Sequence, residues 1–252
     1  MEETKPSFWK KFCAFWIKWH LQYLALAGLL YGLKAALYFI IAYASDATHA
    51  VTFNMEIDKH IPVISYFYFF YLGYYILPEI FMWILSFYDK KKLFTIVLAV
   101  AAANVLACVC FMIQQVKMIR PEAEMAAYSN FSSVYNLDTF FKWAIDKQYK
   151  ADETALNCFP SLHASMGMAL ATIGIWTGKD ENHFPLWMRI FCGVFGVGIV
   201  MSTFFVKQHY FIDAIAGAGL FFALYWLFKL VIVPFYLKKR EQKLQNQNSE
   251  NN

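Results

Sequence analysis

Long runs of apolar residues, rarely interrupted by charge, dominate the pattern of hydrophobic and polar positions along this chain. A helix needs about 20 apolar residues to cross the roughly 30 Å hydrocarbon layer of a bilayer. By this criterion the sequence contains six candidate spans, at residues 21–43, 62–87, 92–115, 162–178, 187–206 and 208–236. The pattern therefore predicts an all-α, polytopic membrane protein whose residues 21–237 form a bundle of six transmembrane helices.

The segments outside these runs differ in composition. In residues 1–20 aromatic residues recur at helical spacing among lysines, which predicts a helix in the cytoplasmic membrane interface. Residues 116–160 form a connection too long to stay structureless in a compact domain. Within it Asp138 can cap a helix that mixes aromatic and charged residues, so we expect a second interfacial helix there, on the outer surface. Residues 238–252 are polar, and we expect a disordered cytoplasmic tail.

The distribution of charge sets the orientation that we expect in the membrane. The chain has 252 residues, 60% of them hydrophobic and 16% charged, with a net charge of +4. Placing both termini in the cytoplasm puts thirteen Lys and Arg inside and seven outside, five of these in the one long loop. This bias satisfies the positive-inside rule, so we expect cytoplasmic termini. Because no soluble face gathers these charges, they indicate the bilayer, and no nucleic acid, as partner.

A histidine and an aspartate, His209 and Asp213, stand together at the start of the last apolar run. A carboxylate inside a span costs about 2.5–3.5 kcal/mol on insertion scales, so it indicates a function. Four residues along a helix bring both side chains to one face, where Asp213 can accept a hydrogen bond from one ring nitrogen of His209. The other nitrogen then stays free as a nucleophile or base. The alternative is a buried pair that only fixes helix contacts.

Other polar groups are expected at the same depth as this pair. Residues 157–163 have the composition of a helix N-terminus, and in the expected topology this end and the start of the last span both face outward. Two such ends form a site for anions. His163 lies one turn inside, and the candidates for phosphate binding around it are Arg120, Ser161, Ser202, Thr203 and Lys207. Two histidines in a cationic pocket indicate phosphoryl transfer through a phosphohistidine.

These residues resemble the signature motifs of the type 2 phosphatidic acid phosphatase superfamily. The Pro-Ser-Leu-His sequence at 160–163 is similar to its second motif, and the Ser-Thr, His and Asp within 202–213 are similar to its third. The Arg-Pro pair at 120–121 matches the end of its first motif. The resemblance covers residues 63–234 and implies a six-helix core whose motifs share the non-cytoplasmic face of the membrane.

The chain departs from the family pattern at three positions. Ile113 stands where the first motif usually has Lys, Leu162 where the second usually has Gly, and Thr203 where the third usually has Arg. Two phosphate-binding cations are thus missing, and Lys117 and Lys207 are the candidates to replace them. The Pro-Ser-Leu-His form is more similar to the inositol phosphorylceramide synthase branch, whose members transfer a phosphoryl-linked head group to a lipid alcohol.

The resemblance implies a role for each candidate. His209 would attack phosphorus, Asp213 would orient and polarise His209, and His163 would protonate the departing oxygen. Arg120, Ser161 and helix amides would hold the phosphate oxygens. Water or an alcohol would then open the phosphohistidine. Because cations and amides stabilise the charge in this scheme, we expect no metal and no other cofactor.

The sequence leaves several functions open. A metal-independent phosphatase acting on a phosphomonoester or pyrophosphate lipid is the leading hypothesis, and a head-group phosphotransferase is the nearest alternative. A transporter would place polar residues at mid-depth on several spans. An inactive scaffold would account for the two missing cations.

Structural roles also stay open for single residues. Ser161 can cap a helix, and Arg120 can snorkel to the interface. Lys34 and Glu79 are intramembrane charges for which the sequence provides no role. The aromatic run of residues 66–75 is expected to pack against other spans or to face lipid.

Overall fold

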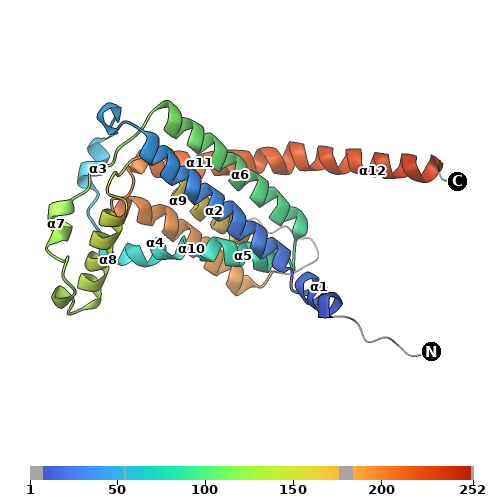
Figure 1. Ribbon diagram of the computed structural model, residues 1–252, viewed down its shortest axis with the longest axis horizontal. Helices are drawn as coiled ribbons and strands as arrows, with labels where there is room; N and C mark the ends of the chain where they lie inside the picture. The colour runs from blue at the N-terminus through green and yellow to red at the C-terminus, as the bar shows by residue number, and fades with distance from the viewer. Residues whose placement is uncertain (1–7, 54, 176–183, 251–252) are drawn as a thin grey trace.

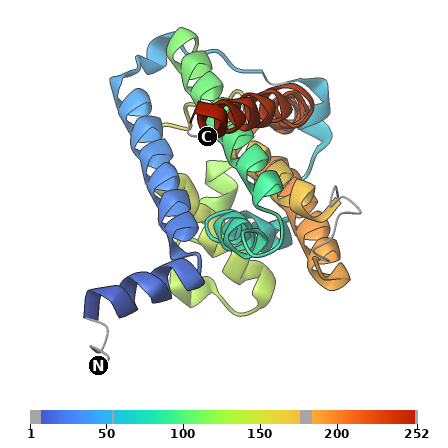
Figure 2. The ribbon, with the colours of Figure 1, turned by 90° about the vertical axis from the view of Figure 1, so that its right-hand side faces the viewer.

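The structure is a computed structural model, which describes residues 8–53, 55–175 and 184–250. This part of the chain is helical (Figures 1 and 2) and contains no strand apart from an isolated bridge between Val51 and Val116. The α-helices are α1 (Phe8–Lys18), α2 (Leu21–Ala44), α3 (Glu56–His60), α4 (Tyr68–Gly73), α5 (Leu77–Leu85), α6 (Lys90–Ile113), α7 (Glu122–Ala126), α8 (Leu137–Ala151), α9 (Leu162–Ile175), α10 (Leu186–Phe205), α11 (Phe211–Leu227) and α12 (Val233–Glu250). The all-α class is therefore confirmed.

Among the described residues, four helices are long and apolar enough to cross a membrane. They are α2, α6, α10 and the continuous helix 211–243, in which the π-helical turn Phe228–Ile232 joins α11 to α12. A fifth candidate is the second predicted run, where residues 65–73 and α5 meet at an angle of 41°. The break precedes Pro78, which lacks an N–H and therefore fits the first turn of a new helix. Length and composition thus give four or five candidate spans among the described residues.

The fourth predicted span is described in part. Its described helix, α9, has 14 residues, which correspond to about 21 Å of helix. The last three residues of that predicted span, 176–178, lie outside the described residues. The C-terminal carbonyls of α9 are bonded within the bundle, because Lys92 Nζ donates to Ile173 O and Arg189 Nε donates to Gly174 O. Six spans therefore remain a prediction.

Helix α9 packs at the centre of the bundle, against α10 and α11. A Cβ at Gly167 would lie 2.8 Å from Gly196 O, and one at Gly196 would lie 2.4 Å from Ala171 N, so only glycine allows this approach. Figure 2, a view along the bundle, shows α2 and α10 on opposite sides with α4 and α5 between them. Close backbone packing of this kind holds helices together where lipid provides no hydrophobic drive.

The long connection folds over one end of the bundle. Figure 1 shows α3, α7 and α8 at this end, and both chain termini at the opposite end. Helix α8 buries Phe141, Ile145 and Tyr149 against α4 and its flanking residues. The connection is therefore folded, as the sequence predicts, whereas the contact of α8 with a membrane interface remains a prediction.

The start of α8 corrects one detail of the sequence analysis. The residue that caps this helix is Asn136, whose side chain accepts from Thr139 N at 2.9 Å. Asp138 accepts a hydrogen bond from the hydroxyl of Ser65 and pairs with Lys142 at 2.8 Å. These two contacts hold the pKa of the Asp138 carboxyl below its ordinary value. Asp138 thus links α8 to the chain segment in front of α4.

The end of the chain also differs from the sequence prediction. The composition predicts disorder over 238–252, but α12 continues to Glu250. Lys, Arg, Glu and Gln are good helix formers, and extending an existing helix requires no new nucleus. The helix therefore runs on beyond the last apolar residues. At the other terminus, α1 occupies the segment for which an interfacial helix is predicted.

Candidate functional site

A cavity opens between α2, α4 and the end of the bundle that α8 covers. It contains about 830 Å³ of empty space, its open mouth included, and so has room for a phosphate group. Its polar lining includes Lys34, Tyr71, Tyr74, Asp152, His163 and His209. Both predicted catalytic histidines therefore face one cavity.

The two histidines lie in contact. The distance from His209 Nε2 to His163 Nδ1 is 3.4 Å, and the ring centroids are 5.5 Å apart. His209 is placed by the turn that follows α10, where the N–H groups of Gln208 and His209 both donate to Thr203 O at 2.9 and 3.0 Å. His163 stands at the start of α9. The end of one helix and the beginning of another thus bring together residues that are 46 positions apart.

The ring of His209 has a defined orientation. Its Nδ1 lies 2.9 Å from the backbone oxygen of Cys158. A carbonyl oxygen only accepts hydrogen bonds, so Nδ1 carries the hydrogen and donates it. In the neutral ring Nε2 then has a free lone pair, and this atom faces His163. The arrangement presents His209 Nε2 as a nucleophile.

Asp213 corrects the expected hydrogen bond to His209. The distance from His209 Nδ1 to Asp213 Oδ2 is 3.8 Å, and Oδ2 instead accepts from Tyr210 N at 2.9 Å. Asp213 is the third residue of α11, and from that position its carboxylate reaches back to cap the helix. Its other oxygen is buried without a hydrogen-bond partner among the described residues. Asp213 therefore caps α11 and lies beside the imidazole as a negative charge.

Tyrosines surround His163. The Tyr71 hydroxyl oxygen lies 3.0 Å from His163 Nε2, and the Tyr71 ring is stacked on the imidazole at a centroid distance of 4.9 Å. The Tyr74 ring lies at 4.1 Å. The sequence analysis expected the aromatic run 66–75 to pack or face lipid and so missed these residues. Their spacing of three places both on one face of the segment, but the same signal is typical of packing.

Arg120 is buried inside the protein and does not snorkel. Its guanidinium donates to the carboxylate and the backbone oxygen of Asp152 and to Gln208 Oε1, and it lies over the Tyr149 ring. Burial lowers the pKa of Arg120, but the Asp152 carboxylate outweighs this effect and raises the pKa above its ordinary value. Sequence reasoning missed Asp152, which brings a negative charge into the cavity lining.

The hydroxyl groups of the three candidates Ser161, Ser202 and Thr203 form hydrogen bonds with backbone groups close in the sequence. Ser161 Oγ accepts from Ala164 N at 3.2 Å and so caps α9. Ser202 Oγ and Thr203 Oγ1 each donate at 2.7 Å to the carbonyl three residues earlier. None of the three lines the cavity. As phosphate-binding residues they are not supported by this geometry.

The two candidate replacement lysines point elsewhere. Lys207 has φ 52°, a left-handed turn, and its Nζ donates to Asp58 O at 2.9 Å. Burial lowers the pKa of Lys207. Lys117 is exposed, and its backbone N–H pairs with Val51 O beside the isolated bridge. Neither lines the cavity, whereas Lys34 does. The sequence marks Lys34 as an intramembrane charge but does not show where its side chain ends.

One group of residues has the ligand types of a metal site. Cys158, His209 and Asp213 offer ligand atoms within 4.8 Å of one another. Most of these atoms already have protein partners, since the Cys158 thiol donates to Ala155 O, His209 Nδ1 donates to Cys158 O and Asp213 Oδ2 accepts from Tyr210 N, whereas Asp213 Oδ1 has none among the described residues. Burial also raises the pKa of the Cys158 thiol, which disfavours the thiolate that a metal requires. The group therefore fits a metal ion poorly.

Comparison with known proteins places the site in a family. A family model described as PAP2 superfamily matches residues 46–227, which include α9, the turn after α10 and all of α11. No curated protein and no solved structure matches the chain. The family model covers well over half of the chain. This protein therefore belongs to the PAP2 superfamily, whose membership supports a phosphatase-type enzyme.

Proposed function

We propose that this protein is an integral membrane lipid phosphate phosphatase that hydrolyses a phosphomonoester or pyrophosphate lipid through a phosphohistidine on His209. The observation that carries the proposal is the orientation of His209, whose Nδ1 is bonded to Cys158 O while Nε2 faces His163 in the cavity. The superfamily match supports the reaction class. The substrate class rests on two candidate spans, α2 and the bent pair that contains Tyr71, whose residues line the cavity.

The reaction proceeds in two steps. In the first, His209 Nε2 attacks phosphorus, the P–O bond to the lipid breaks, and protonated His163 gives its proton to the departing oxygen. The imidazole of His209 becomes positive, and the Asp213 carboxylate at 3.8 Å stabilises that charge. In the second step water attacks phosphorus, His163 takes the proton of this water, and the P–N bond breaks. His163 is thereby protonated again.

One part of the site that reaches the histidines can stabilise the phosphate oxygens. Arg120 keeps one buried donor, Nε, without a partner among the described residues, but Arg120 is paired with Asp152 and does not line the cavity. The N-terminal turn of α9 contributes backbone amides and the positive end of its dipole. No metal takes part in this scheme, so turnover should persist in the presence of chelator.

A head-group phosphotransferase is the second candidate, and Leu162 favours it. This residue stands where the second motif usually has Gly, and its side chain lines the cavity. An apolar wall beside the phosphohistidine disfavours water and favours a lipid alcohol as acceptor. Incubation with candidate acceptor alcohols separates the two functions, because transfer gives a lipid product and hydrolysis gives free phosphate.

The decisive experiment is to trap the intermediate. Purified protein is incubated in chelator with labelled lipid phosphates and phospholipids, and the denatured protein is tested for an acid-labile, base-stable adduct. We expect label on the wild type, on His163→Ala and on the control His60→Ala, which changes an exposed histidine of α3. His209→Ala should carry none. Label retained by His209→Ala would refute the assigned nucleophile.

We also propose that both termini are cytoplasmic and that the cavity opens on the non-cytoplasmic face. The proposal is supported by the positive-inside bias and by the position of the termini at the end of the bundle away from α7 and α8 (Figure 1). Single cysteines introduced at Ser129 and Gln247, in a variant without native cysteines, can be labelled in sealed vesicles. A membrane-impermeant reagent that reaches both positions from one side would contradict this topology.

A further inference from the structure

A buried lysine on α2 has no carboxylate partner. Lys34 is 7% exposed, its Nζ donates to Tyr74 Oη at 2.6 Å, and the ammonium lies over the rings of Tyr31 and Tyr74. Among the described residues no carboxylate lies within 4.0 Å of this ammonium. An ammonium has three donors, and one of them is used here. A charge with so few partners is costly to bury unless a ligand completes it.

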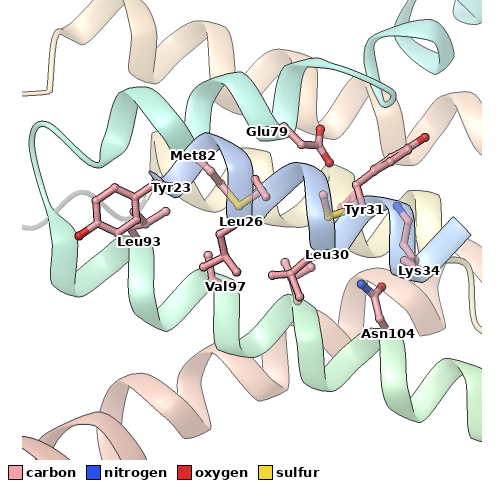
Figure 3. Close-up of a pocket in the computed structure, with 13 residues that line it drawn as sticks. Tyr23, Leu26, Leu30, Tyr31, Lys34, Glu79, Met82, Leu93, Val97 and Asn104 are labelled. Carbon is pink, nitrogen blue, oxygen red and sulfur yellow. The ribbon is translucent and has the colours of Figure 1, made fainter. Parts of the chain in front are cut away.

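The nearest acidic residue of that region is Glu79, and it does not pair with Lys34. Both residues line a second cavity, which extends from Lys34 along α2 between apolar side chains (Figure 3). Figure 3 shows Tyr31, Lys34 and Asn104 at one end of this cavity, with Leu26 and Val97 further along. One carboxylate oxygen of Glu79 has no hydrogen-bond partner among the described residues. Lys34 thus lines both cavities without an ion-pair partner among the described residues.

Lys34 is connected to the catalytic histidines through one tyrosine. Its ammonium bonds the hydroxyl of Tyr74, whose ring lies 4.1 Å from the His163 ring, and His163 in turn contacts His209. Of the lysines and arginines that the structure describes, Lys34 is the one that lines the histidine cavity. Arg120 is already paired with Asp152, and Lys207 bonds the backbone of α3.

We propose that Lys34 binds a non-bridging oxygen of the substrate phosphate while His209 attacks it, and that α2 thereby supplies the cation that residues 113 and 203 lack. The inference rests on the proposed function for the identity of the site. Helix α2 precedes residues 46–227, so this contact comes from outside the part of the chain that the family model matches. Lys34 would act electrostatically as a phosphate ligand, because a positive ammonium beside the negative phosphate oxygens of the transition state lowers the activation barrier.

Binding and catalysis are measured separately to test this proposal. Full-length protein in detergent is unfolded thermally with and without inorganic phosphate, since a ligand that binds the folded state raises the melting temperature. Phosphate should stabilise the wild type and not Lys34→Met, whereas Lys34→Arg, which keeps the charge, should recover part of the shift. The matched control is Lys229→Met. Lys229 also lies over two aromatic rings, those of Tyr225 and Trp226, and it does not line the cavity.

Turnover provides the second measurement. Loss of one charge-stabilising donor typically reduces kcat by about 10²–10³-fold, and we expect a loss of this size in Lys34→Met. Tyr74→Phe removes the hydroxyl that Lys34 bonds but leaves the ammonium, so it should keep the phosphate-induced shift. If Tyr74→Phe abolishes the shift as completely as Lys34→Met, Lys34 acts only by positioning Tyr74, and the proposal is wrong.

The two proposals can fail independently. Suppose that the wild type turns over lipid phosphates and that Lys34→Met keeps both the phosphate-induced shift and a kcat/KM within threefold of the wild-type value. This result overturns the role of Lys34 and leaves the proposed function intact. A wild type that turns over no lipid phosphate, but shows a phosphate shift that depends on Lys34, rejects the function and supports the site. Lys34→Met should also be at least as stable as wild type without phosphate, because it removes an unpaired buried charge. A lower stability would indicate a structural lysine and contradict the proposal.

Discussion

Gly217 of α11 determines how closely the two catalytic segments approach. A Cβ at this position would lie 2.1 Å from Ser161 O and 2.9 Å from Ser161 C. Ser161 caps α9 two residues before His163, and its N–H donates to Asp213 O at 3.0 Å. Replacing Gly217 with alanine therefore pushes the helix that carries Asp213 away from the helix that carries His163.

The size of this displacement follows from the structure. Ordinary contact begins at 3.4 Å, so the two backbones must separate by about 1.3 Å, the difference between 3.4 and 2.1 Å. A misplacement of about 1 Å can reduce catalysis by about 10²-fold. Overpacking of this kind costs about 1–3 kcal/mol of stability. We therefore expect Gly217→Ala to fold, to melt at a lower temperature and to lose about two orders of magnitude in kcat.

The matched control is Gly219→Ala on the same helix, where a Cβ meets nothing within 4 Å. It should have wild-type kcat and a stability equal to or above that of the wild type, because alanine favours helix more than glycine does. Thermal unfolding and single-turnover formation of the phosphohistidine measure the two effects. If both glycine variants behave alike, the close approach of Ser161 to α11 does not position the site, and the reasoning fails.

Three further predictions concern charge. Asp213→Asn keeps an oxygen that can accept from the N–H of Tyr210 but removes the negative charge beside His209. The variant should fold normally and lose about 10²–10³-fold in kcat. Unchanged single-turnover rates would show that the carboxylate serves only as a cap. Lys207→Ala and Lys117→Ala should each keep kcat/KM within threefold, because neither lysine lines the cavity. A loss of tenfold or more in a lipid phosphate assay would contradict this geometry. Arg120→Ala leaves the Asp152 carboxylate without its ion-pair partner. Chemical denaturation should show a free energy of unfolding that is lower by about 3–5 kcal/mol. A decrease below about 1 kcal/mol, which is the range of exposed ion pairs, would show that the pair is well solvated.

The helices could be predicted from the sequence better than their ends and breaks. Each apolar run contains a helix at the expected place, because the length of a run reports how much helix can be buried. The bend before Pro78 was harder to predict, since apolar composition continues through it. The helical tail was mispredicted because polar composition alone does not show that a helix already formed upstream continues into it.

The site shows a different limit of sequence reasoning. The spacing of four predicts that His209 and Asp213 come near each other, and they do, at 3.8 Å. The expected shared helix is not observed, because α11 begins at Phe211 and His209 lies in the turn before it. The spacing does not predict which acceptor the imidazole chooses, because the competing group, Cys158 O, belongs to a distant part of the chain. For the same reason Lys207 seemed a suitable cation, although its left-handed backbone turns the side chain to α3.

The orientation of the nucleophile is set by a loop that the sequence presents only as a helix cap. Asn157 has φ 58°, a conformation that asparagine tolerates better than most residues. Its N–H donates to Gln115 Oε1 at 2.9 Å, and its Oδ1 accepts from Gln115 Nε2 at 2.8 Å. This reciprocal pair fixes the backbone directly before Cys158, whose carbonyl then selects the nitrogen of His209 that carries the hydrogen. The reactivity of His209 Nε2 thus depends on an amide pair, Gln115 with Asn157, neither member of which is a candidate for catalysis or phosphate binding.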